Sequence, residues 1–127
     1  MTMTKTGTTT YIDGFVASVP SDAKDAYVAH CLRCEPVFTE AGALRIVDGW
    51  GDDVPHGKLT DFHMAVKAAA GETVVFGWIE WPSKAARDAG MAKVMQDPRM
   101  APEVNPMPFD GKRMIYGGFA KLNDSRA

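Results

Sequence analysis

The chain has 127 residues, of which 46% are hydrophobic and 24% charged, a length and balance that suit one globular domain with its own core. The net charge of −2 gives no field that attracts nucleic acid, and no segment approaches the roughly 18 consecutive apolar residues of a membrane span. We therefore expect neither a nucleic-acid partner nor a membrane partner.

The first ten residues are rich in threonine and lack the apolar stretch of a secretion signal. We interpret residues 1–10 as a flexible tail, residues 11–122 as a single α+β domain and residues 123–127 as a C-terminal tail. Because no export signal is present, we expect a cytoplasmic protein in which Cys31 and Cys34 are free thiols.

The first half of the domain predicts a strand, a helix and a strand. Aromatic and β-branched residues favour a strand over residues 11–19. Ser21 is the expected N-cap of a helix over residues 22–40, and Pro36 predicts a kink or break near residues 32–35. Gly42 is expected to end that helix in a left-handed conformation, before a second strand over residues 43–50. The buried stripe of the helix is expected to hold Tyr27, Val28, Cys31, Leu32 and Phe38.

The second half begins with a loop over residues 51–60. Alternation at Phe62, Met64 and Val66 then favours a short strand, although a helical turn remains possible. A strand over residues 73–81 is followed by a helix over residues 84–96 that Ser83 caps, and by a last strand over residues 112–120. The second helix is expected to bury small residues, namely Ala85, Ala89, Ala92 and Met95. This order predicts a ferredoxin-like α+β fold, an antiparallel sheet with two helices on one face.

Strands that are apolar on both faces predict a second cover for the sheet. The strand over residues 73–81 carries Val75, Ile79 and Trp81 on one side and Val74, Phe76 and Trp78 on the other. Two helices cover only one face, and the second would be a larger apolar patch than a monomer tolerates. We therefore predict a homodimer through the sheet. The alternative is that the N-terminal tail and the proline-rich loop over residues 99–109 cover this face within one chain.

Five stretches of the chain are distinctive: YIDGF at residues 11–15, WGDDVPHGKLTDF at 50–62, WIEWPSKAARD at 78–88, DPRM at 97–100 and MPFDGKRMIYGGF at 107–119. They resemble the bacterial YbaA-like proteins of unknown function, and the resemblance covers roughly residues 11–122. It implies a dimeric α/β barrel, in which two ferredoxin-like units close their sheets against each other. It implies no established activity.

His30, Cys31 and Cys34 lie on the first predicted helix at spacings that place pairs of them on one face, where they could bind a soft metal. Structural zinc normally takes four ligands, and the sequence shows no second Cys/His pair with the spacing of a zinc motif. We favour the alternative in which Cys31 packs in the core and His30 is solvated. The sequence therefore predicts no metal and no cofactor.

Asp52, Asp53, His56 and Asp61 gather around the loop that follows the second strand. A histidine beside carboxylates can act as a general base near neutral pH. Aspartate and glycine are also the residues that tight turns require, so an ordinary acidic turn is the favoured alternative.

Asp13 and Glu80 are charged residues within otherwise apolar strands, and burial of an unpaired carboxylate is costly. Arg45 and Arg113, also on strands, are their expected partners. Such pairs could be structural salt bridges, or they could form the polar floor of a cavity with a carboxylate available for proton transfer.

We predict a cavity between the sheet and its helices, with Asp13, His63 and Arg113 as catalytic candidates and Trp50, Trp78 and Tyr116 as pocket residues. By analogy with other dimeric α/β barrels, the dimer could bind a small molecule or act as a cofactor-free enzyme. The alternative is a non-catalytic interaction or stress-related module, whose marked residues serve only to build the dimer.

Overall fold

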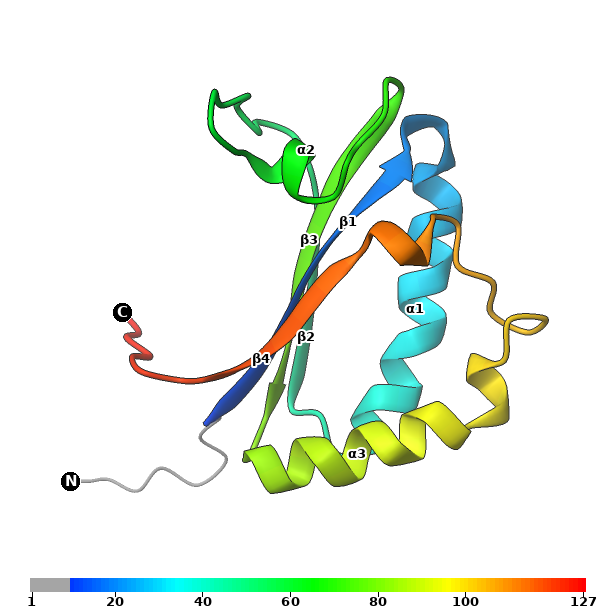
Figure 1. Ribbon diagram of the computed structural model, residues 1–127. Helices are drawn as coiled ribbons and strands as arrows, with labels where there is room; N and C mark the ends of the chain where they lie inside the picture. Colours follow the sequence, from blue (N-terminus) through cyan, green and yellow to red (C-terminus); the bar gives the residue numbers. More distant parts are fainter. Residues whose placement is uncertain (1–9) are drawn as a thin grey trace.

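A four-stranded antiparallel sheet organises residues 10–127, the part of the chain that the computed structural model describes (Figure 1). The flexible tail expected over residues 1–10 therefore falls almost wholly outside the described residues. The strands are β1 (Tyr11–Pro20), β2 (Arg45–Trp50), β3 (Glu72–Trp81) and β4 (Ile115–Ala120). The helices are α1 (Lys24–Glu40), α2 (Phe62–Ala65) and α3 (Lys84–Gln96), with 3-10 turns η1 (Ser21–Ala23), η2 (Pro98–Met100) and η3 (Gly111–Arg113). None of the described helices combines the length and apolar character that crossing a membrane requires.

The strand order is β2-β3-β1-β4, and every neighbouring pair is antiparallel. The two central strands pair along their whole length, from Tyr11 opposite Trp81 to Pro20 opposite Glu72. β4 then adds beside β1, and β2 adds beside β3. This is the strand order of a ferredoxin-like unit, so the α+β class expected from the sequence is confirmed.

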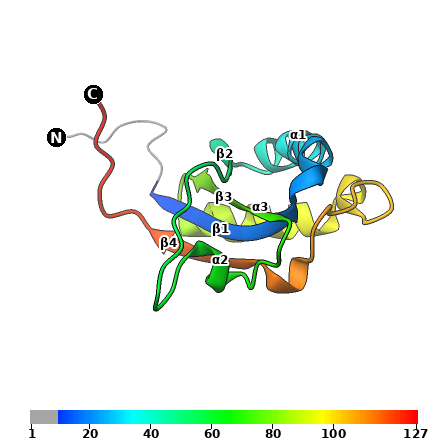
Figure 2. The same cartoon turned by 90° about the horizontal axis from the view of Figure 1, so that it is seen from above.

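Helices α1 and α3 lie on the same side of the sheet (Figures 1 and 2). We call this side the covered face. Ala17 and Val75 are directly opposite in the register and fully buried there, together with Val19. Tyr27 of α1 packs on this cluster, which forms the main core. The covered face is thus closed by the chain itself.

Trp81 is the largest fully buried side chain of the described residues, and its indole packs against α3 at Gly90. A Cβ atom on Gly90 would lie 2.8 Å from the Ala41 carbonyl oxygen and would overlap the Trp81 ring. Only glycine lets the helix approach the tryptophan this closely. The stripe predicted for this helix is therefore wrong: Gly90 and Val94 are buried, whereas the side chain of Met95 is 78% exposed.

The first helix also differs from its predicted form. Ser21 does not cap it, because η1 precedes α1 and the Ser21 hydroxyl shares a hydrogen bond of 2.7 Å with Thr73. The helix continues through Pro36 without a break. Tyr27 is buried as predicted, but Leu32 is 62% exposed. Gly42 has a φ of 117°, as expected for the residue that follows the helix end.

The strand favoured for residues 62–66 is a short helix instead. Asp61 precedes it in extended conformation, and its carboxylate accepts a hydrogen bond of 2.6 Å from the Met64 backbone N–H. This N-cap bond stabilises a helical turn more directly than the alternating pattern stabilises a strand. The following Val66 is fully buried against Val16 and Val74.

Candidate functional site

The second face of the sheet, which we call the open face, carries large apolar side chains that remain exposed. Phe76 and Ile115 are each 46% exposed, and Phe119 is 61% exposed. The segment around α2 covers only one end of this face, where Val66 packs (Figure 1). The proline-rich loop lies on the other side of the molecule, beside α1 (Figure 1). It therefore does not supply the cover that the sequence left as an alternative.

A hollow of about 320 Å³ lies on the open face between β1, β3 and β4. Gly14 lines the hollow without a side chain, and Gly117 stands opposite Gly14 on the neighbouring strand. The Phe119 ring leans over both glycines, 3.8 Å and 3.6 Å from where their Cβ atoms would be. Aromatic cover of this kind protects glycines in a sheet. The hollow is lined by Ile12, Gly14, Phe76, Trp78 and Phe119.

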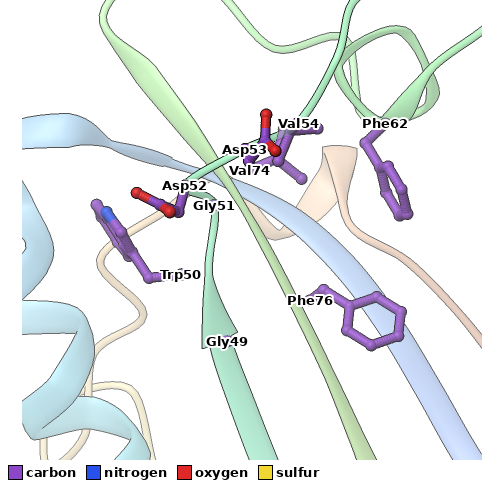
Figure 3. Close-up of a pocket in the computed structure, with 9 residues that line it drawn as sticks. All are labelled: Gly49, Trp50, Gly51, Asp52, Asp53, Val54, Phe62, Val74 and Phe76. Atoms are coloured by element: carbon purple, nitrogen blue, oxygen red, sulfur yellow. The ribbon is translucent and has the colours of Figure 1, made fainter.

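A second hollow of about 220 Å³ adjoins the first at the end of β2 (Figure 3). Phe76 lines both hollows, and its ring meets the Phe62 ring edge-on, with centroids 6.2 Å apart. The rim is acidic, because Asp52 and Asp53 of the loop after β2 stand on it. Figure 3 shows Trp50 pointing away from Phe62 and Phe76, toward the covered face.

The other end of the open face is polar. Glu80 is only 8% exposed, and its carboxylate accepts a hydrogen bond of 2.8 Å from the Trp78 indole N–H. Arg45 lies 3.6 Å from the same carboxylate oxygen, so Arg45, one of the two arginines expected as partners of Asp13 and Glu80, pairs with Glu80. Trp78 thus joins the apolar hollow to a paired carboxylate.

Asp13 lies on the covered face. Its neighbour Gly14 is the residue opposite Trp78 in the register, so the side chains of Asp13 and Trp78 lie on opposite sides of the sheet. Its carboxylate accepts a hydrogen bond of 2.9 Å from the Trp81 indole N–H and lies 3.3 Å from the Arg87 guanidinium. Neither Arg45 nor Arg113 is its partner. The structure therefore does not bring Asp13 and Trp78 together in one pocket, and the contacts of Asp13 are those of a structural residue.

Arg113 lies in η3 rather than in the predicted strand, and it binds Glu72 through two hydrogen bonds of 2.8 Å. It also donates to the Lys67 carbonyl oxygen and pairs with Asp110. The Arg113 guanidinium lowers the pKa of Glu72 to about 2. Arg113 therefore connects η3 to the turn before β3 and is occupied by these contacts.

The four polar residues predicted around the loop after β2 fall into two separate places. Asp52 and Asp53 line the second hollow, whereas Asp61 turns inward with a side chain that is 6% exposed. His56 and His63 flank Asp61, with ring nitrogens 3.8 Å and 3.9 Å from its carboxylate oxygens. The structure thus adds His63 to this group. The strand that the sequence favours over residues 62–66 would have placed His63 away from the loop.

A polar group under α1 includes a residue that the sequence did not single out. Asn105 of the proline-rich loop is 3% exposed, and its carbonyl oxygen lies 2.9 Å from His30 Nδ1. The Cys34 thiol lies 3.6 Å from His30 Nε2 and accepts a bond of 3.3 Å from the Asn105 amide. His30 is therefore bound rather than solvated.

The thiol, imidazole and amide under α1 have the order of partners that activates a cysteine nucleophile. Burial, however, raises the pKa of Cys34 and lowers the pKa of His30, so the neutral pair is favoured over thiolate and imidazolium. Burial also raises the pKa of Cys31 to about 12. Both cysteines are free thiols, as expected, and their surroundings are those of structural groups.

The remaining pocket candidates lie on different sides of the molecule. Trp50 packs against Tyr27 in the core of the covered face, with ring centroids 6.1 Å apart. Tyr116 lies on the edge strand β4 and is 78% exposed. Of the pocket residues predicted from the sequence, Trp78 lines the larger hollow and Trp50 borders the smaller one.

Comparison with known proteins places the chain among relatives of its own length. The model of a family described as proteins of unknown function, DUF1428, matches residues 10–111. The chain is 60% identical over 114 residues to the uncharacterized protein YbaA of Escherichia coli strain K12, and this match covers 90% of the chain and 97% of the relative. The YbaA proteins of Escherichia coli O157:H7 and Shigella flexneri match to the same extent.

Proposed function

The chain belongs to the DUF1428 family of proteins of unknown function, and we propose that it acts as a homodimer whose two open faces pack together around a site for a small, mainly apolar molecule. The observation that carries this proposal is the uncovered apolar surface of Phe76, Ile115 and Phe119 over the hollow of about 320 Å³. The resemblance to YbaA-like proteins, for which a dimeric α/β barrel is expected, supports the same arrangement.

The chemistry of the open face favours a second copy of this chain over a partner of another kind. Among the described residues its middle is apolar, and the charges lie at its ends, where Arg45 pairs with Glu80 and where Asp52 and Asp53 form the acidic rim. A neutral apolar surface is complementary to itself, and a two-fold axis lets each copy cover the other. The contact removes the same apolar residues from water on both sides.

The edge strand β4 supports the same conclusion. It is six residues long and exposes Ile115, Tyr116 and Phe119 without a charged residue among them. An exposed apolar edge strand pairs readily with other chains unless something covers it. A dimer that closes a barrel covers both the open face and this edge.

The hollow supports a ligand between the two copies. Its volume falls at the lower end of the range of small-molecule sites, which begins at about 300 Å³. Four aromatic or aliphatic side chains and one glycine line the hollow and favour an apolar ligand, and the Trp78–Glu80 bond places one polar group at its end. In a dimer, the hollows of both copies would face each other.

Light scattering or sedimentation tests the dimer. We expect wild-type protein at about 10 μM to have twice the mass of one chain, since a dimer of micromolar affinity is populated there. Phe119→Asp should yield a folded monomer, because two buried carboxylates would face each other across the axis. Leu32→Asp is the matched control, since Leu32 is equally exposed but lies on α1. A wild-type monomer, or dissociation by Leu32→Asp alone, would contradict the proposal.

An apolar fluorescent probe, 8-anilinonaphthalene-1-sulfonate, tests the site. We expect wild-type dimer to bind it, and Gly14→Val to lose binding while remaining a dimer, because the added methyl groups occupy the hollow. Gly14→Ala is the control, since a Cβ atom there makes only ordinary contact with Phe119 at 3.8 Å. A dimer that binds no probe would instead support the second candidate, a non-catalytic interaction module with a fully packed interface.

A further inference from the structure

We infer that His56, Asp61 and His63 form a binding site for a divalent transition-metal ion, with zinc as the reference ion. One ligand atom of each residue lies within 4.8 Å of the other two. The two imidazole rings are stacked, with centroids 4.1 Å apart and an interplanar angle of 14°. The sequence predicted no metal, and its own candidates for one were His30, Cys31 and Cys34 under α1.

Asp61 is the fixed part of this site. Its two carboxylate oxygens accept hydrogen bonds from the backbone N–H groups of Gly57 at 2.8 Å and Met64 at 2.6 Å. These bonds, that from Gly57 first, lower the pKa of Asp61 and keep it ionised. Backbone donors that orient a ligating carboxylate are typical of metal sites in proteins. A carboxylate oxygen that accepts one hydrogen bond retains a further lone pair for a metal ion.

His63 supplies the second, independent indication of a ligand. Its Nδ1 atom is buried and has no hydrogen-bond partner among the described residues. A buried polar atom without a partner is costly, and a bound ion or water is one of the arrangements that satisfies such an atom. This nitrogen lies 3.9 Å from the Asp61 carboxylate.

His56 is the mobile part of the site. Its side chain is 80% exposed and stacks on His63, so rotation of one exposed side chain brings its nitrogen to the ion. Zinc holds its nitrogen and oxygen ligands at about 2.0–2.2 Å, and two ligand atoms of a tetrahedral ion are therefore about 3.3–3.6 Å apart. The observed spread of 4.8 Å or less requires only such a local adjustment.

Two imidazole nitrogens and one carboxylate select first-row transition metals rather than calcium or magnesium, which prefer oxygen ligands. Three protein ligands also leave a coordination position for water or for a small ligand. The bound ion would join the loop after β2 to α2. Because Asp52, Asp53 and Phe62 of the same segment line the second hollow, the ion would also fix the rim of that hollow.

Isothermal titration of metal-free, untagged protein with zinc tests the inference. We expect one ion per chain, and binding at least about tenfold weaker in His56→Ala and in His63→Ala, because each variant removes one of three ligands. His56→Ala should fold normally, since its side chain is mostly in water. His30→Gln is the matched control: it removes the third histidine of the chain, outside the site, and should bind zinc like the wild type.

Thermal unfolding gives a second readout. Zinc should raise the melting temperature of the wild type and of His30→Gln, but not that of His63→Ala, since an ion stabilises only a fold that binds it. Three results would overturn the inference. They are no zinc uptake at about 100 μM, unchanged affinity in both His56→Ala and His63→Ala, and loss of binding in His30→Gln, which would place the ion beside Cys34.

Discussion

The two faces of one sheet are built from the same strands and both carry large apolar side chains, yet they lie in different surroundings. On the covered face, Ala17, Val19, Val75 and Trp81 are fully buried by α1 and α3 of the same chain. On the open face, Phe76 and Phe119 remain about half exposed. The difference shows that residue type alone does not decide burial. The placement of the helices decides which face is buried, because α1 and α3 both lie on one side of the sheet (Figures 1 and 2).

The largest effect is expected from truncating Trp81 on the covered face, and Phe119 on the open face is its comparison. Trp81→Ala should lower the free energy of unfolding by about 3–5 kcal/mol, because it leaves a cavity under α3 and removes the donor to Asp13. Phe119→Ala should cost less than about 1 kcal/mol within a single chain, since its side chain is 61% exposed. Urea denaturation of dilute protein measures both values. Equal losses would mean that the two faces do not differ as described.

Asn105→Ala should have the next largest effect, a loss of about 1–3 kcal/mol, because it leaves buried polar partners unsatisfied. The Asn105 side chain binds His30, Arg33 and Cys34, and thereby attaches the proline-rich loop to α1. Asn123→Ala, in the exposed C-terminal segment, is the control. Denaturation curves of both variants test whether the covered face depends on this loop as well as on its helices.

Acid should weaken the ion pair that Arg113 of η3 forms with Glu72 of β3. The pKa of Glu72 is lowered to about 2 from an ordinary value of 4.5, so its contribution to stability is complete above pH 4.5 and is lost as the pH falls through 2. Glu72→Gln should be less stable at neutral pH by about 1–2 kcal/mol and should vary less with pH in that window. Unfolding measured from pH 2 to pH 6 gives both values. Glu103→Gln, an exposed carboxylate, should behave like the wild type.

The smallest effect is expected at the start of α3. The Ser83 hydroxyl accepts a hydrogen bond of 3.0 Å from the Ala86 backbone N–H, so Ser83→Ala should cost about 1 kcal/mol. Ser21→Ala is the matched change before α1, where the hydroxyl caps no helix, and should cost less. Thermal unfolding of the pair compares the two helices of the covered face. A larger loss in Ser21→Ala would reverse this comparison.

The sequence predicts most of the fold because its strong signals are local. Ser83 was identified as the cap of the helix over residues 84–96, and the structure confirms both the cap and the bounds. The buried side of that helix was not predictable from periodicity, since alanines, Gly90 and Val94 all permit helical stripes. Contact with the bulky Trp81 side chain selects Gly90, and this contact joins residues from different elements.

The group formed by His56, Asp61 and His63 was missed for a different reason. Alternation over Phe62, Met64 and Val66 suggested a strand, which separated His63 from the loop. The competing signal was Asp61, three residues before Met64, at the spacing of an N-cap. Asn105 gave no comparable signal, because its burial depends on where a proline-rich loop meets α1.

The pairing of β1 with β3 has a consequence for how the chain acquires its structure. Tyr11 and Trp81, which pair at one end of these strands, are separated by more than half the length of the chain. The residues of β4, which pair with β1 on its other edge, come later still in the sequence. Contacts between such distant segments slow folding, which for sheets of this kind takes milliseconds to seconds. During synthesis, both edges of β1 stay unpaired until most of the chain has left the ribosome, because residues 72–81 and 115–120 are made late. Protection of β1 from aggregation therefore depends on how soon these later strands emerge.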